Sequence, residues 1–225
     1  MLTSVWKKLK VNMQKYFDIS PRLSEKLAVF PGDQPFKRNV AMSWDKKDHL
    51  ELSSITTTLH AGSHADAPSH YRAGGETIES RDLNRYIGPC SVVRVKVARG
   101  ARIGVGDLPA GLKVLPRMLF ATDSFNEPNV WRGDFNSFAP ELIHHLADKG
   151  VRLIGIDTPS VDPADSKALE SHQALFDRDY AVLEGLFLKD VPAGEYFLSA
   201  LPLAIQGGEA GPVRAALWPK GFEFK

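Results

Sequence analysis

Cysteine is almost absent from this 225-residue sequence, which contains only Cys90. A single cysteine excludes an internal disulfide framework, and a chain of this length can bury a sizeable core without such cross-links. Because Cys90 precedes the apolar segment SVVRVKV, we expect it to be a buried small residue. This cysteine usage favours a reducing cytoplasm as the location.

Long hydrophobic runs and an excess of one charge are also missing. No segment approaches the roughly 20 apolar residues that a membrane-spanning helix needs. The N-terminal segment MLTSVWKKLKVNMQKYF lacks the apolar core and cleavage site of a secretion signal. The 28 lysine and arginine residues nearly balance 27 aspartate and glutamate residues, giving a net charge of +1. We therefore expect neither a membrane nor a nucleic acid as a partner.

The sequence has no internal repeat and no low-complexity linker, so we expect one domain over residues 16–225 after an N-terminal arm, residues 1–15. The arm is either a short amphipathic helix or a loosely held segment. Alternating or continuous apolar segments predict strands over residues 16–20, 49–60, 90–97, 117–123, 151–159 and 196–206. Helices are expected over residues 135–150, with Ser137 as the cap and Gly150 as the stop, and over 166–176 and 179–188. This mixture predicts a compact α/β domain, or an α+β domain, with a mixed sheet.

Two common catalytic motifs are absent. There is no G-x-S-x-G sequence of the kind that carries a nucleophilic serine. The segment QGGEAGP lacks the Lys-Ser/Thr pair of a phosphate-binding loop, so it reads as an ordinary turn. Neither a serine hydrolase nor a nucleotide-binding protein is favoured.

The segment LHAGSHADAPSHY, residues 59–71, concentrates three of the seven histidines beside one carboxylate. On a straight strand His60 and His64 would stand about 13 Å apart, and on a helix Asp66 would face away from them. Gly62 tolerates positive φ, so a strand end followed by a tight turn could gather His60, His64 and Asp66. Imidazole and carboxylate suit zinc, manganese or iron. We favour metal binding by this segment, and surface histidines in a polar loop are the alternative.

Two titratable residues outside this segment are further candidates for the metal site, and the remaining histidines are not. Glu184 interrupts the apolar run AVLEGLFL, so it must be protonated, paired or bound to a metal ion if it is buried. His172, twelve residues earlier, could reach the same ion or could be a partly exposed helix residue. His49 lies in the charged segment WDKKDHLE and is expected in solvent, and His144 and His145 are assigned to a helix flank without a functional role.

The segment HAGSHADAPSH resembles the H-x-G-x-H-x-D-x-P-x-H motif of the metal-dependent, cyclase-like amidohydrolases. The likeness extends over nearly the whole chain from about Tyr16. It includes FDISPRLS, VFPGDQPF, YIGPCSVVRV and GPVRAAL. The blocks GIDTPSVDP and DVPAGEY are most similar to the arylformamidase, or kynurenine formamidase, branch of that family.

This resemblance implies a fold, a metal site and an oligomeric state. The family fold is a compact α/β domain with a swivelling β/β/α arrangement, and its members are commonly homodimers. The resemblance implies two divalent ions, with zinc expected and manganese as the alternative. The matching positions assign His60, His64 and Asp66 to one ion. Asp66 would bridge to a second ion held by His172 and Glu184.

The resemblance also implies a reaction. His70 matches the catalytic acid/base, and Phe30 matches a substrate-lining position where formamidases usually carry tryptophan. The expected substrate is a small aryl amide, the formamide of N-formylkynurenine, an intermediate of tryptophan degradation that would be cleaved to kynurenine and formate. Because Phe30 departs from the pattern, opening of a cyclic amide or lactone such as isatin is the alternative. A third possibility is a metal-dependent binding protein without catalysis, although retention of His70 counts against it.

Overall fold

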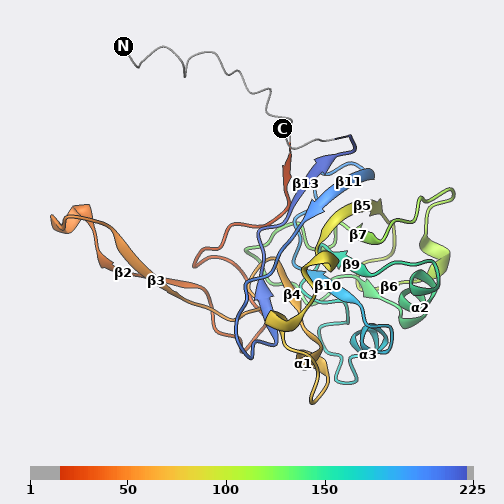
Figure 1. Cartoon of the computed structure of the whole chain (residues 1–225), viewed down its shortest axis with the longest axis horizontal. Helices are drawn as coiled ribbons and strands as arrows, with labels where there is room; N and C mark the ends of the chain where they lie inside the picture. The colour runs from red at the N-terminus through yellow and green to blue at the C-terminus, as the bar shows by residue number, and fades with distance from the viewer. Residues whose placement is uncertain (1–15, 222–225) are drawn as a thin grey trace, which may run out of the picture.

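A nine-stranded mixed sheet forms the centre of the computed structural model, which describes residues 16–221. Four parallel strands lie in the middle, and antiparallel strands extend the sheet on both sides (Figure 1). The predicted α/β domain with a mixed sheet is confirmed. The arm over residues 1–15 lies outside the described residues. The strand order is β1 (Phe17–Asp18), β13 (Ala216–Pro219), β11 (Gly194–Ser199), β5 (Ile87–Arg94), β7 (Arg117–Ala121), β9 (Leu153–Ile156), β10 (Ala181–Glu184), β4 (His64–Asp66) and β12 (Ala210–Pro212).

Three α-helices, four short 3-10 helices and two small sheets complete the described fold. The helices are α1 (Pro68–Tyr71), α2 (Pro140–Asp148) and α3 (Glu170–Asp177). The small sheets pair β2 (Lys37–Met42) with β3 (Leu52–Thr56), and β6 (Arg102–Ile103) with β8 (Ser137–Phe138). None of the helices in the described part of the chain is long and apolar enough to cross a membrane.

The central strands are buried on both faces of the sheet, which explains their continuous apolar sequences. In β7, Met118 and Phe120 pack in the same cluster as Leu142 of α2. The alternate residue Leu119 belongs to the cluster on the opposite face, together with Leu183 of β10. Cys90, in β5, is buried and unpaired as expected. Helices α2 and α3 therefore cover one face of the parallel strands.

Strands β2 and β3 form a hairpin that extends away from the rest of the molecule (Figure 1). It carries exposed apolar side chains, among them Trp44 (62% exposed) and Ile55 (61% exposed). The expected strand over residues 49–60 is therefore only partly right. β3 does lead toward His60, but it pairs with β2 and not with the main sheet.

The helix expected over residues 179–188 is wrong. Residues Ala181–Glu184 form β10, which lies between β9 and β4 and is buried along its whole length. A short apolar run that is buried on both faces has no amphipathic period, so periodicity cannot distinguish a strand from a helix. Glu184 is consequently the last residue of a strand.

The other helix boundaries also shift. Ser137 lies in β8 and does not cap α2; Pro140 occupies the first turn, and Ala139 is the capping residue, without a side-chain hydrogen bond. Gly150 does end this region, with φ of 86°. Helix α3 begins at Glu170, later than the expected Ser166, because Leu169 adopts a left-handed conformation at φ 49°.

Candidate metal centre

The pairing of β4 with β10 brings the N-terminal histidine motif to Glu184. In this antiparallel ladder Glu184 lies opposite His64, and Val182 lies opposite Asp66. Cross-strand partners project to the same face of a sheet, so the side chains of His64, Asp66 and Glu184 share one face. Val182 packs in the cluster that contains residues of α3, so this face is the one that α3 covers. His172 of α3 therefore reaches the same point.

A bend at Gly62 returns His60 to the cluster, as the sequence predicted. Gly62 has φ of 65°, a conformation that glycine adopts without steric cost. The ring centroids of His60 and His64 are 4.9 Å apart. His60 Nδ1 lies 3.1 Å from Asp66 Oδ1, although its side chain is still 16% exposed. The bend thus leaves His60 at the mouth of an otherwise buried group.

The two carboxylates both face His64 and His172. His64 Nε2 lies 3.3 Å from Asp66 Oδ1 and 3.4 Å from Glu184 Oε2. His172 Nε2 lies 3.4 Å from Asp66 Oδ2 and 3.5 Å from Glu184 Oε1. One oxygen of each carboxylate is therefore directed at His64 and the other at His172. All five ligands that the family resemblance implied converge in one place.

Unsatisfied atoms show that this group fits a divalent cation. His64 Nε2 and Asp66 Oδ1 are buried and have no hydrogen-bond partner of acceptable geometry. Leaving buried polar atoms unpaired is costly, and a shared cation would satisfy both. The candidate ligand atoms of His60, His64 and Asp66 all lie within 4.8 Å of one another. Those of Asp66, His70 and His172 form a second such group. Nitrogen and carboxylate oxygen together suit a divalent transition metal or zinc.

In His60, His64 and His172, the ring nitrogen that faces away from Asp66 and Glu184 also lies near an acceptor oxygen. His64 Nδ1 lies 2.9 Å from the Gly62 carbonyl oxygen, and His172 Nδ1 lies 2.8 Å from Asp162 Oδ2. His60 Nε2 lies 3.5 Å from Glu209 Oε1 at the surface. An acceptor at one ring nitrogen leaves the other free to act as a ligand. Neither Asp162 nor Glu209 was identified from the sequence, because their partners depend on tertiary packing.

The electrostatics of the group are dominated by its carboxylates. Burial disfavours the imidazolium form of His64, but Asp66 and Glu184 outweigh it and raise the pKa of His64 to about 10. Burial opposes protonation of His172 in the same way, but Asp162 and Asp66 raise its pKa to about 10. The same donor atoms therefore attract protons and cations, and a bound metal ion would displace the protons.

His70 lies beside this group on α1, which begins at Pro68. Its residue surface is exposed, and its ring centroid is 4.4 Å from that of His60 and 5.8 Å from that of His172. Burial of the imidazole against neighbouring atoms lowers the pKa of His70, the opposite of the shift at His64. The structure thus brings His70 to the solvent side of the cluster.

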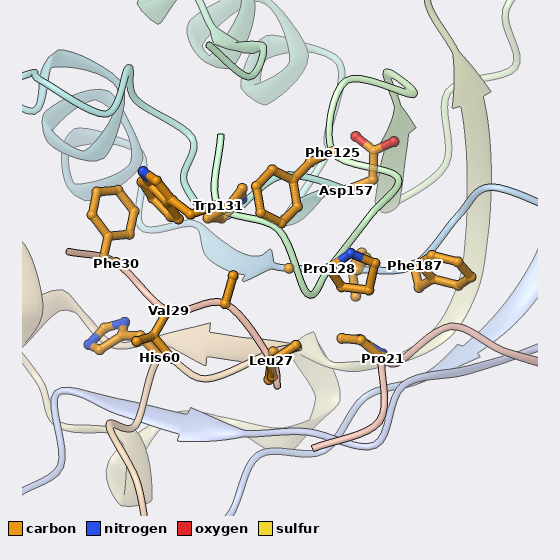
Figure 2. A pocket seen from close by; sticks show the side chains of 15 residues that line it. Pro21, Leu27, Val29, Phe30, His60, Phe125, Pro128, Trp131, Asp157 and Phe187 are labelled. Carbon is orange, nitrogen blue, oxygen red and sulfur yellow. The ribbon is translucent and has the colours of Figure 1, made fainter. Parts of the chain in front are cut away.

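An aromatic pocket adjoins the cluster at His60. Its lining includes Phe30, Phe125 and Trp131, with Asp157 at the end near Phe125 (Figure 2). The rings of Phe30 and Trp131 are 4.6 Å apart. Sequence reasoning identified Phe30 but not Trp131, which is distant in the chain. His49 and the pair His144 and His145 stand apart from the groups of candidate ligands in the described residues.

The fold and this centre define a class: α/β proteins with a buried cluster of imidazoles and carboxylates that fits a divalent cation. Residues 17–163 match the model of the cyclase family, whose description reads "Putative cyclase". The chain belongs to this family, which confirms the resemblance found in the sequence.

Similar proteins include curated kynurenine formamidases and solved structures. Kynurenine formamidase from Bordetella pertussis is 43% identical over 214 residues, covering 91% of this chain and 98% of that protein. A solved structure described as a potential metal-dependent hydrolase with cyclase activity is 30% identical, with a TM-score of 0.79 over 93% of this chain and 100% of the other. Isatin hydrolase A from Ralstonia solanacearum shares the fold, with a TM-score of 0.72 over 92% of each chain but only 22% identity.

Proposed function

We propose that this protein is a metal-dependent amidohydrolase that cleaves the formamide of N-formylkynurenine to kynurenine and formate. The observation that carries the proposal is the similarity to kynurenine formamidases along nearly their whole length. The aromatic pocket beside His60 supports it, because the substrate carries its formamide on a benzene ring.

The proposed cofactor is a pair of divalent ions, with zinc expected and manganese as the alternative. His60, His64 and Asp66 would hold one ion, and Asp66 would bridge to a second ion held by His172 and Glu184. When bound, such ions lower the pKa of a coordinated water and polarise a carbonyl oxygen. The unpaired buried atoms His64 Nε2 and Asp66 Oδ1 support this assignment.

His70 is proposed as the acid/base. Water adds to the formyl carbon, and the neutral His70 imidazole takes the proton that water loses. The C–N bond then breaks, and His70 delivers this proton to the departing aniline nitrogen, so a neutral amine and formic acid leave. Formic acid releases its remaining proton to solvent at neutral pH and becomes formate. The exposed position of His70 beside His60 supports the role, since the ring can meet a substrate entering from solvent. Such acid–base help contributes about 10²–10⁴ in rate.

Phe30 and Trp131 would bind the aromatic ring of the substrate. Aromatic pairs prefer tilted or offset contacts with centroids about 4.5–7 Å apart, and these two rings already provide such surfaces. Phe30 stands where formamidases usually have tryptophan, and this difference favours isatin as the second candidate substrate. Isatin also contains an amide nitrogen attached to a benzene ring, so the same pocket would accept it.

One experiment separates the candidate functions. Zinc-loaded or manganese-loaded protein is offered N-formylkynurenine or isatin, and kynurenine or the opened acid is followed by its absorbance. We expect kynurenine to form faster. Opening of isatin alone would identify the second candidate, and turnover of neither would favour a metal-dependent binding protein.

We also propose that the enzyme is a cytoplasmic homodimer. The extended β2–β3 hairpin supports a second copy as its partner, because isolated two-stranded hairpins are marginally stable in water. Exposed Trp44 and Ile55 on the hairpin would be buried by such a partner. Buried Cys90, in a chain without other cysteines, is compatible with a reducing compartment.

A further inference from the structure

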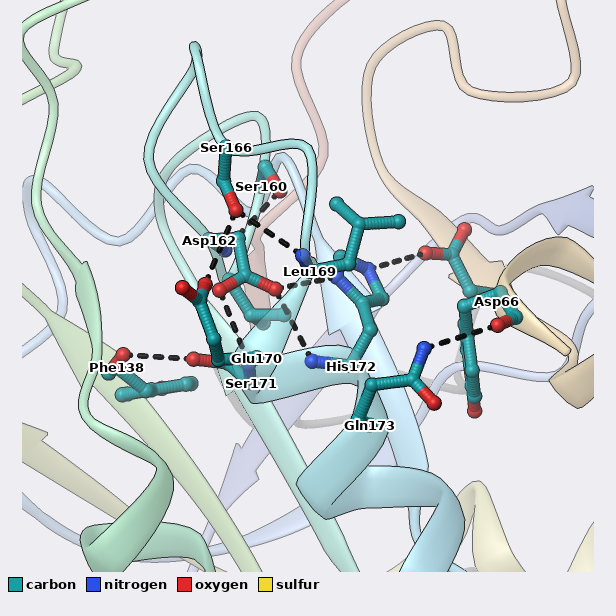
Figure 3. Close-up of polar contacts among 12 residues, drawn as sticks. Asp66, Phe138, Ser160, Asp162, Ser166, Leu169, Glu170, Ser171, His172 and Gln173 are labelled. Carbon is teal, nitrogen blue, oxygen red and sulfur yellow. Dashed lines mark hydrogen bonds and ion pairs between the residues drawn. The ribbon is translucent and has the colours of Figure 1, made fainter.

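Asp162 is a fully buried carboxylate immediately behind the metal centre. Its Oδ2 accepts hydrogen bonds from the backbone N–H of His172 (3.1 Å) and lies 2.8 Å from Nδ1 of the same residue. Its Oδ1 accepts from the Ser171 backbone N–H at 3.0 Å (Figure 3). The same oxygen accepts from Arg102 Nη1 at 3.2 Å. A carboxylate is costly to bury unless it is paired, and here both oxygens are fully engaged.

Two of these bonds cap helix α3. The capping position is occupied by Leu169, which has no side chain able to accept a hydrogen bond. Asp162 accepts from the free backbone N–H groups of Ser171 and His172 in its place, which is what a capping carboxylate does. The cap fixes the first turn of α3, and with it the backbone from which His172 projects.

The bond to Nδ1 acts on the imidazole of His172 itself. When Nδ1–H of His172 donates to Asp162, the lone pair of Nε2 faces Asp66 and Glu184 at 3.4 and 3.5 Å. The other two imidazoles assigned as metal ligands, His60 and His64, lack a buried anion in this position. His64 uses a neutral backbone carbonyl, and His60 uses the largely exposed carboxylate of Glu209. An anionic acceptor also makes Nε2 more basic and so a stronger ligand.

We infer that Asp162 is a positioning residue, which fixes the tautomer and orientation of His172 so that Nε2 can ligate the second ion. The inference rests on the proposed metal-dependent function. Arg102 supports Asp162 from the far side, since its guanidinium also bonds the Phe138 carbonyl oxygen and Glu170. Asp162 lies in the block GIDTPSVDP, which resembles the formamidase branch of the family. The inference assigns this aspartate a role in holding His172.

The test compares Asp162→Ala and Asp162→Asn with Asp165→Asn, an exposed carboxylate three residues further along the same loop. Zinc is titrated into metal-free protein in competition with a chromophoric chelator, and bound zinc is counted by elemental analysis. We expect two ions for the wild type and for Asp165→Asn. Asp162→Ala should keep one ion and bind the other about 10–100-fold more weakly. Asp162→Asn should lose less, because its amide oxygen still accepts from Nδ1–H.

A second comparison separates ring orientation from helix capping. Ser166→Ala removes the hydroxyl that accepts from the Leu169 N–H near the start of α3, without touching His172. It should lower the thermal midpoint and leave both zinc affinities unchanged. In a His172→Ala background, adding Asp162→Ala should not weaken zinc binding further.

The outcomes are distinguishable. Wild-type protein that binds no zinc would refute the proposed metal-dependent function. Wild-type protein with two ions, together with an unchanged Asp162→Ala titration, would overturn the role of Asp162 alone. An equal loss in Ser166→Ala would reduce that role to capping.

Discussion

Gly185 follows Glu184 directly and touches the backbone of the histidine motif. Its φ is 62°, and a Cβ added there would lie 2.2 Å from the Gly62 carbonyl oxygen and 2.8 Å from the Gly62 carbonyl carbon. This oxygen also lies 2.9 Å from His64 Nδ1 and, as a carbonyl oxygen, accepts a hydrogen bond from it. Gly185→Ala must therefore push apart the two segments that carry His64 and Glu184.

The expected cost has two parts. A left-handed conformation costs a residue with a Cβ about 1–2 kcal/mol, and overpacking a rigid site adds about 1–3 kcal/mol. The free energy of unfolding should therefore fall by about 2–5 kcal/mol. Gly150→Ala isolates the first part, because Gly150 also has positive φ (86°) but its Cβ would meet no atom within 4 Å.

Urea unfolding of both variants in chelator, followed by circular dichroism, measures the difference without a contribution from metal binding. We expect Gly185→Ala to unfold at a clearly lower urea concentration than Gly150→Ala, and to bind zinc more weakly because the Gly62 carbonyl is displaced. Coincident unfolding curves for the two variants would show that the close backbone approach does not constrain the fold, and would refute this reasoning.

Three further predictions follow from the site, the hairpin and the buried pocket. His60→Ala should lose zinc and activity together, whereas His70→Ala should retain zinc and lose about 10²–10⁴ in kcat; full turnover by zinc-loaded His70→Ala would exclude the acid/base role. Trp44→Ser should shift light-scattering mass from dimer to monomer, and a monomeric wild type would contradict the dimer. Burial raises the pKa of Asp157 to about 6 from 3.8, so its contribution to stability is present below pH 4 and lost as the pH rises through 6. Urea unfolding should show wild type losing about 2 kcal/mol relative to Asp157→Asn between pH 4 and 7, and parallel profiles would disprove this.

The sequence was most informative where residue chemistry conflicted with its surroundings. His60, His64 and Asp66 could be grouped because only a bend would bring them together, and Gly62 supplied that bend. Glu184 was singled out as a carboxylate within an apolar run, and it is indeed buried beside the histidines. In each case the cost of an unpaired polar group points to a partner, even when the partner is unknown.

The sequence was least informative where tertiary packing decided the outcome. The segment around Glu184 was expected to be helical, because a fully buried strand lacks the alternation that identifies a strand. Asp162 and Trp131 were missed, since one acquires its role from the docking of α3 and the other from a distant loop. Strand β2 was not predicted from the sequence, and its residues KRNVAM form a strand by pairing with β3.

The ladder between β4 and β10 also has a consequence for biosynthesis. Glu184 and His64 are direct neighbours across this ladder, yet most of the chain is translated between them. A nascent polypeptide that has not yet extended β10 beyond the ribosome lacks Glu184, one of the two carboxylates of the group. Completion of the centre must therefore await nearly the whole translation product, and an incomplete chain released earlier would carry only part of the ligand set.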